Sequence, residues 1–236
     1  VEVRVFNPVH HYVNRLYFNY RDHRKITCVD GDIAYTGGAN IADEYANLIE
    51  RFGYWKDCGL RLEGEGAWGL TREFLQMWQR MDGQLYHEYD YYRPLHHPLE
   101  QGFCQTVVDG PDDNPNNAAE DLFLQMIGRA RREVYITTPY LAIDEPMLKA
   151  LCLAAGSGVD VRIPDHKFAY LVAESYFDQL MAHDVKIYTF TPGLVHGKTV
   201  LTDRETAFVG SVNMDYRSFQ LHFECGEVFY GTPAIE

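Results

Sequence analysis

The second half of the chain alternates between helical and strand patterns of apolar residues. Apolar side chains from Ala119 to Ala130 recur every three or four residues, which predicts an amphipathic helix. Asp144 precedes Glu145 and Pro146, and a capping residue with an acidic, proline-containing first turn predicts the start of a second helix. The pattern further predicts a helix over 168–182 and strands over 134–138, 159–163 and 185–188. Alternating helices and strands favour an α/β fold with a mixed or parallel sheet.

The first half shows fewer such units. Val1–Phe6 alternates as a strand would, and apolar spacing predicts a helix over 67–81. The helix and strand units before the second motif described below have no counterpart before the first, so we expect the first half to begin inside a domain. Residues 93–115 contain four prolines and are the best linker. We therefore expect two halves, 1–92 and 116–236.

A repeat links the two halves. The pattern His-x-Lys-x4-Asp-x6-Gly-[Gly/Ser]-x-Asn occurs twice, and every marked position in the second copy lies 173 residues after its equivalent in the first. A short apolar strand is expected between the aspartate and the glycine of each copy, at 33–35 and 206–208. The marked residues are His23, Lys25, Asp30, Gly37, Gly38 and Asn40, and then His196, Lys198, Asp203, Gly210, Ser211 and Asn213.

Composition narrows the function. The chain has 236 residues, 46% of them hydrophobic, and a net charge of -13. An acidic chain disfavours general nucleic-acid binding, which needs a basic surface. No apolar run is long enough to span a bilayer. The five cysteines are widely spaced and form no CxxC pair, so neither a disulfide framework nor a zinc site is expected.

The repeated motif carries the candidate chemistry. Alternate residues of a strand share one face, so His-x-Lys directs an imidazole and an ammonium into the same space. Asp30 and Asp203 have the opposite parity and are expected to stabilise turns. Gly38 and Ser211 allow close backbone approach next to the asparagines. If the halves face each other, one phosphodiester-binding site is surrounded by His23, Lys25, Asn40, His196, Lys198 and Asn213.

Two histidines suit a two-step displacement at phosphorus. One imidazole attacks and forms a phosphohistidine, while the other protonates the leaving group and then deprotonates the acceptor. The symmetry of the repeat leaves open which histidine attacks. Each ring needs an acceptor for its second nitrogen. The candidates are Asp57, 34 residues after His23, and Glu224, 28 residues after His196. No metal or other cofactor is expected.

Longer stretches around the motifs resemble the phospholipase D superfamily, and within it the bacterial cardiolipin synthases. The resemblance implies two pseudo-symmetric α/β domains with the active site between them. It also implies transfer of a phosphatidyl group from one phosphatidylglycerol to another with release of glycerol. The stretches are 19–26, 35–41, 138–141 and 209–219.

The same resemblance implies that His23 is the nucleophile and His196 the acid and base. It implies a phospholipid substrate and a place at the bacterial cell membrane, with the catalytic region on the cytoplasmic side and anchored by segments that this sequence lacks. Nucleic acid is not an expected partner. Two alternatives stay open: a phosphodiester hydrolase of the same superfamily, acting on lipid or nucleic acid, and an inactive fragment.

Overall fold

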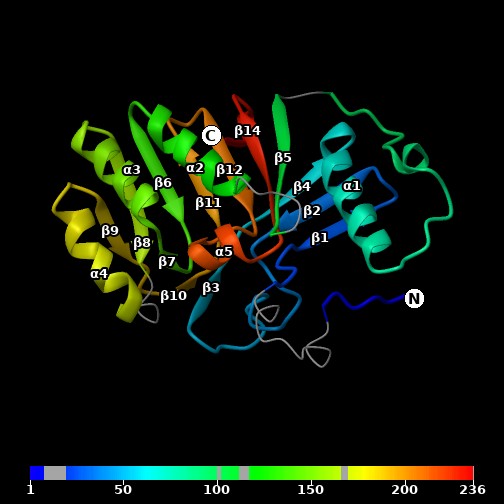
Figure 1. Ribbon diagram of the computed structural model, residues 1–236, viewed down its shortest axis with the longest axis horizontal. Coiled ribbons are helices and arrows are strands. Elements are labelled where there is room, and N and C mark those ends of the chain that lie inside the picture. The colour runs from blue at the N-terminus through cyan, green and yellow to red at the C-terminus, as the bar shows by residue number, and fades with distance from the viewer. Residues whose placement is uncertain (8–19, 100–101, 112–116, 166–169, 236) are drawn as a thin grey trace.

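The computed structural model describes residues 1–7, 20–99, 102–111, 117–165 and 170–235 (Figure 1). These residues form a mixed α/β fold, which confirms the predicted fold class. In Figure 1 a large sheet with helices packed on it lies next to a small sheet that has a helix of its own. The four long helices are α1 (Glu65–Arg80), α2 (Ala118–Arg129), α3 (Glu145–Gly156) and α4 (Tyr170–Met181).

The large sheet has seven strands in the order β5-β14-β12-β11-β6-β8-β9. Neighbours are antiparallel from β5 to β6 and parallel from β6 to β9. The strands are β5 (Phe103–Asp109), β6 (Glu133–Thr137), β8 (Asp160–Asp165), β9 (Lys186–Thr189), β11 (Thr199–Thr202), β12 (Thr206–Gly210) and β14 (Glu224–Tyr230).

Alternating burial along these strands builds the main core. Ile136 of β6 and Phe208 of β12 are buried, as are Phe123 of α2 and Leu151 of α3. The Phe123 and Phe208 rings meet edge to face with centroids 4.9 Å apart. Burial of each such side chain stabilises the fold by roughly 1.5–3 kcal/mol. α3 begins as predicted, because the Asp144 carboxylate accepts a hydrogen bond of 3.0 Å from the backbone amide of Met147.

The small sheet has three antiparallel strands in the order β1-β2-β4. They are β1 (Ile26–Val29), β2 (Ile33–Gly37) and β4 (Gly59–Glu63). Helix α1 packs on this sheet, and Leu70 of α1 shares a buried apolar cluster with Ala34 and Leu62 of the sheet. Phe229 of β14 belongs to the same cluster, so the two sheets are joined by apolar packing.

The internal repeat appears as two equivalent β-hairpins. Both β1 and β11, and both β2 and β12, are separated by the 173 residues that separate the motifs. The strands that follow, β4 and β14, are also equivalent, but they are separated by a smaller number of residues. Gly37 of β2 pairs with Gly59 of β4, and Gly210 of β12 pairs with Gly226 of β14. By this register, Asp57 and Glu224 occupy equivalent positions. The division into two domains stays a prediction.

Short strands join the two halves near the motifs. β3 (Tyr54–Lys56) of the first half pairs in parallel with β10 (Gly193–Val195) of the second. An isolated parallel bridge between Asp22 and Phe223 makes the equivalent contact on the other side. The remaining short elements are β7 (Leu141–Ala142), β13 (Met214–Asp215), α5 (Tyr216–Gln220), and the 3-10 helices η3 (Tyr89–Tyr92) and η4 (Pro233–Ile235).

Two expectations differ from the structure. Val1–Phe6 is not a strand, because a period-2 pattern forms one only where a neighbouring strand pairs with its backbone, and no pairing involves these residues among those described. The stretch 93–115 contains β5, which belongs to the large sheet, so it is more than an irregular linker.

Residues 168–169 of the predicted fourth helix lie outside the described residues. Among the described helices, none has the length and apolarity needed to cross a bilayer.

Candidate active site

The backbone places each motif histidine against the other half of the chain. The amide of His196 donates to the carbonyl of Lys56 at 2.7 Å, and the amide of His23 donates to the carbonyl of Phe223 at 2.9 Å. Lys56 and Phe223 come directly before the two candidate carboxylates. The same backbone contact therefore brings each histidine next to a carboxylate of the opposite half.

The imidazole of His23 is held by Glu224. Its Nδ1 lies 3.0 Å from both carboxylate oxygens, and the side chain of Glu224 has no exposed surface. Ser211 donates its hydroxyl to Glu224 at 2.5 Å. Burial alone would raise the pKa of Glu224, but hydrogen bonds from His222, His23 and Ser211 outweigh it and hold that pKa at about 2. Glu224 is therefore an anion in contact with Nδ1 of His23.

His196 has the equivalent contact with Asp57. Its Nδ1 lies 2.7 Å from Oδ2 of Asp57, while Oδ1 accepts a hydrogen bond of 2.8 Å from the backbone amide of Cys58. Burial alone would raise the pKa of Asp57, but the interactions with His196 and Lys198 lower it below its usual value. Burial lowers the pKa of His196; Asp57 opposes this, and Lys198 adds to it.

The carboxylates are thus exchanged between the halves. Sequence distance associated Asp57 with His23 and Glu224 with His196, whereas the structure pairs Asp57 with His196 and Glu224 with His23. Both residues sit beside an imidazole, as an orienting role requires, and that role stays a prediction.

The two lysines also bring both halves together. Lys198 is buried, and its Nζ lies 2.9 and 3.1 Å from the two ring nitrogens of His196. Burial lowers the pKa of Lys198 to about 7, opposed by Asp57 and reinforced by the charge of Lys25. Burial also lowers the pKa of Lys25, with Glu224 opposing. Lys25 contacts the His23 carbonyl. Charges of each half therefore act on the lysine of the other.

The asparagines of the motif have different surroundings. Asn213 is buried, and its Oδ1 has no hydrogen-bond partner among the described residues. Asn40 is exposed and donates to the hydroxyl of Tyr45 at 2.6 Å. It lines a cavity of about 850 Å³ together with Lys25 and Asp57. The structure thus places one asparagine in the interior and the other at the opening beside Lys25.

Gly38 and Ser211 occupy equivalent positions with different roles. A Cβ at Gly38 would lie 2.3 Å from Oδ1 of Asp57 and 2.9 Å from the His196 carbonyl, so only glycine fits there without displacing Asp57. Ser211 has room for a side chain because its hydroxyl bonds Glu224 and the amide of Cys225. Each residue packs against the carboxylate of its own half.

The motif aspartates lie in the hairpin turns. Asp30 and Asp203 have φ values of 54° and 55°, in the left-handed region that Asp tolerates. The carboxylate of Asp203 accepts hydrogen bonds of 2.7–3.0 Å from three consecutive backbone amides, 131–133. In the turn between β1 and β2, the carboxylate of Asp32 has this role instead. It accepts hydrogen bonds from the backbone amides of Leu95 and His96, at 2.6 and 2.9 Å.

Sequence reasoning missed three aromatic residues around the histidines. Trp55 and His222 occupy equivalent positions, two residues before the carboxylates, and their rings lie 5.5 Å from His196 and 5.3 Å from His23. The ring of Tyr45 lies edge-on to His196 at 5.1 Å. Only the register between β2 and β4, and between β12 and β14, reveals the first two as a pair.

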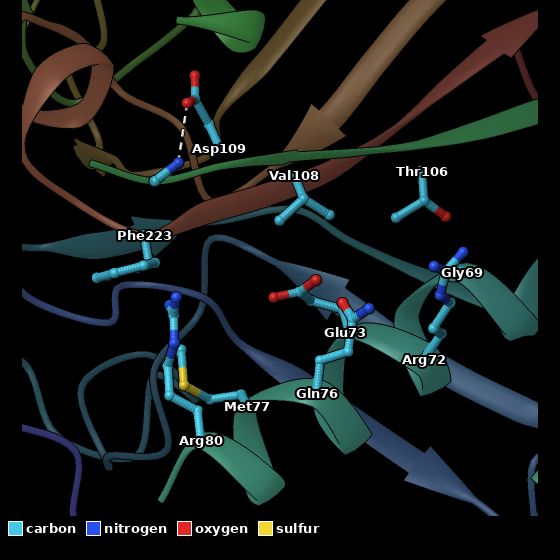
Figure 2. Close-up of a pocket in the computed structure, with 11 residues that line it drawn as sticks. Gly69, Arg72, Glu73, Gln76, Met77, Arg80, Thr106, Val108, Asp109 and Phe223 are labelled. Atoms are coloured by element: carbon cyan, nitrogen blue, oxygen red, sulfur yellow. Dashed lines mark hydrogen bonds between the residues drawn. The ribbon is translucent and has the colours of Figure 1, made fainter. Parts of the chain in front are cut away.

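A second cavity lies next to Phe223, whose carbonyl accepts the hydrogen bond from the amide of His23. It has about 600 Å³ and lies between α1 and β5 (Figure 2). Phe223 borders it, while Arg72, Gln76 and Arg80 of α1 line the opposite side in Figure 2. The motif residues do not line this cavity.

Comparison with known proteins identifies a domain in the second half of the chain. The family described as "Cardiolipin synthase, PLD-like domain" matches residues 123–236, so this half contains a phospholipase D-like domain. A cardiolipin synthase of Listeria welshimeri is 38% identical over 242 residues, which cover 99% of this chain and 50% of that protein. An uncharacterised protein of Streptococcus mutans is 43% identical over 242 residues, 100% of this chain and 52% of that protein. The chain thus spans about half the length of these relatives.

A solved structure shares the fold over most of the chain. The phosphatidylserine synthase of Haemophilus influenzae superposes with a TM-score of 0.66, at 15% sequence identity. The match covers 91% of this chain and 58% of that one. At this identity the likeness shows the fold alone.

Proposed function

We propose that the intact protein is a cardiolipin synthase that transfers a phosphatidyl group between two phosphatidylglycerol molecules. The observation that carries the proposal is the exchange of carboxylates, because Nδ1 of each histidine is held by the opposite half. This exchange supports a single site with two imidazoles. The names of relatives 37–38% identical, cardiolipin synthases, support the substrate class.

The electrostatics of the site suit a phosphodiester anion. The buried amine of Lys198 has a pKa of about 7, so without substrate its charged and neutral forms are about equally populated near pH 7. An anionic phosphate next to Lys198 and Lys25 would favour the charged form of both. Charge-assisted hydrogen bonds from these groups would stabilise the phosphoryl oxygens during transfer.

The proposed reaction has two balanced steps. Nε2 of neutral His23 attacks phosphorus, the bond from phosphorus to glycerol oxygen breaks, and protonated His196 gives its proton to the departing glycerol. Neutral His196 then takes the proton of a hydroxyl of the second phosphatidylglycerol, whose oxygen attacks phosphorus and breaks the bond to His23. The exposure of the side chains supports this assignment: 25% for His23, against 10% for His196.

The cavity next to Lys25 supports a lipid substrate. Besides Lys25, Asn40 and Asp57, its lining includes the apolar side chains of Ile26 and Leu60. A charged end and an apolar wall match the two parts of a phospholipid. We propose that the protein acts at the bacterial cell membrane, with this site on the cytoplasmic side.

The test is product analysis with the intact protein in mixed micelles of phosphatidylglycerol. We expect cardiolipin and glycerol in equal amounts, and loss of both in His23→Ala and His196→Ala. His183→Ala is the matched control, because His183 is an exposed histidine on the large-sheet half. Phosphatidic acid as the main product would instead indicate a hydrolase. Absence of every product would refute phosphodiester chemistry at this site.

A further inference from the structure

Three potential metal ligands converge beside the first motif. His23, His222 and Glu224 each offer one ligand atom, and these atoms lie within 4.8 Å of one another. Oε1 of Glu224 lies 3.0 Å from Nδ1 of His23 and 3.3 Å from Nδ1 of His222. Two ligands of a tetrahedral Zn²⁺, each about 2.0–2.1 Å from the ion, are separated by about 3.3 Å. The two separations between Glu224 and the imidazoles are therefore near those that such an ion requires, and the two imidazole donors lie within 4.8 Å of each other.

The burial of the three side chains favours a site rather than a chance surface cluster. Glu224 has no exposed surface, and the side chain of His222 is 11% exposed. His23 is the open member, 25% exposed, and its exposed edge gives an ion and a water ligand access from solvent. Two imidazoles and one carboxylate are ligands that Zn²⁺ prefers.

The other half lacks this arrangement. At the position equivalent to His222 stands Trp55, whose indole nitrogen has no lone pair available for a metal. Asp57 and His196 therefore have no third ligand from that position. The two halves share the motif but differ in this one residue, so metal binding would act on His23 alone.

We infer that His23, His222 and Glu224 form an inhibitory site for Zn²⁺ or a similar transition metal ion. The metal binds Nδ1 of His23, which moves the ring proton of the neutral imidazole to Nε2. Nε2 then has no lone pair with which to attack phosphorus. Binding at Nδ1 of His222 requires the same shift, so no proton leaves the site. The binding part of this inference is independent of the proposed function, while the inhibition rests on it.

The ammonium of Lys25 limits the affinity. Lys25 interacts electrostatically with Glu224, and its charge opposes that of an incoming divalent ion. The site therefore binds metal more weakly than a closed structural zinc site with four protein ligands. This suits reversible inhibition rather than a permanently bound ion.

The test measures metal binding and activity separately in the intact protein. Co²⁺ replaces Zn²⁺ as the spectroscopic probe, because its visible absorption reports tetrahedral coordination. The variant is His222→Asn, with His222→Gln as the second choice if the first does not fold. The matched control is His96→Ala combined with His97→Ala, which removes two exposed imidazoles paired with Asp32 and Glu65.

We expect one tetrahedral Co²⁺ per chain, at least about tenfold weaker binding in His222→Asn, and unchanged binding in the control. Zn²⁺ should lower cardiolipin formation, EDTA should restore it, and His222→Asn should require at least about tenfold more Zn²⁺. Equal Co²⁺ binding by His222→Asn and the original protein would overturn the inference. If no cardiolipin forms under any condition, the proposed function fails, while the absorption still decides the metal site.

Discussion

Replacing Gly38 by alanine tests how the halves depend on each other. The new Cβ would lie 2.3 Å from Oδ1 of Asp57, and real Cβ contacts are essentially never below 3.0 Å. Asp57 must therefore move by at least 0.7 Å, from 2.3 to 3.0 Å. The His196 carbonyl, 2.9 Å away, restricts movement of the methyl group in the other direction. The carboxylate that holds Nδ1 of His196 at 2.7 Å is thereby displaced.

The expected cost is large for activity and moderate for stability. Misplacement of a reacting group by about 1 Å can cost about 10²-fold in rate. Overpacking of an interior position costs about 1–3 kcal/mol of unfolding free energy. For a chain of this size, each kcal/mol lowers the melting temperature by about 2–4 °C. We therefore expect Gly38→Ala to fold, to melt a few degrees lower, and to lose about 10²-fold in turnover.

Gly197→Ala is the matched control. Gly197 lies between His196 and Lys198, yet a Cβ there meets its neighbours, the nearest in Cys58 and Thr137, at 3.5 Å, an ordinary contact. Turnover is measured as cardiolipin formed per minute from phosphatidylglycerol micelles, and stability by thermal unfolding. Equal turnover of Gly38→Ala and Gly197→Ala would refute the argument that Asp57 must stay in place for the reaction.

Three further predictions follow from single residues. His196→Ala should lower turnover about 10²- to 10⁴-fold, the range for general acid-base catalysis, in the same assay. Asp203→Ala should lower the unfolding free energy by about 1–3 kcal/mol, measured by urea unfolding at pH 7, because three backbone amides lose their acceptor. Backbone hydrogen bonds lower the pKa of Asp203 below 3.8 against burial, so this difference should shrink as the pH falls from 3.8 through that lowered pKa. Burial raises the pKa of Glu227 from 4.5 to about 7, so this carboxyl is neutral in the folded protein at pH 4 and becomes a buried anion above pH 7. The free energy of unfolding is therefore higher at pH 4 than above pH 7, and Glu227→Gln should remove up to about 3 kcal/mol of this difference.

The sequence predicted the parts of the fold that depend on local pattern. The 173-residue offset between the motifs is also the offset between β1 and β11 and between β2 and β12. Helix α1 lies within two residues of the expected range, because its apolar stripe packs on the small sheet. Strand β5 could not be predicted, since its side chains from Phe103 to Gln105 are exposed and it is held by pairing with β14.

The sequence could not predict which histidine each carboxylate contacts, and the reason is different. Asn40 and Asp57 are separated by 17 residues, but Asn213 and Glu224 by 11. The repeat therefore loses its constant offset in this loop, and only strand register shows that the two carboxylates are equivalent. Which histidine a carboxylate contacts depends on tertiary contacts between the halves, such as the pairing of β3 with β10.

Two copies of one motif acquire different chemistry from their surroundings. Around His23, three donors hold the pKa of Glu224 at about 2, so this carboxylate stays anionic and, without a metal, accepts the hydrogen bond of the Nδ1–H group of the neutral imidazole. A fixed proton on Nδ1 leaves the lone pair on Nε2, as a nucleophile requires. Around His196, burial and two lysines weaken the hold on a proton, which suits a group that gives and takes protons. The environment thus supports the proposed roles although the motifs themselves are alike.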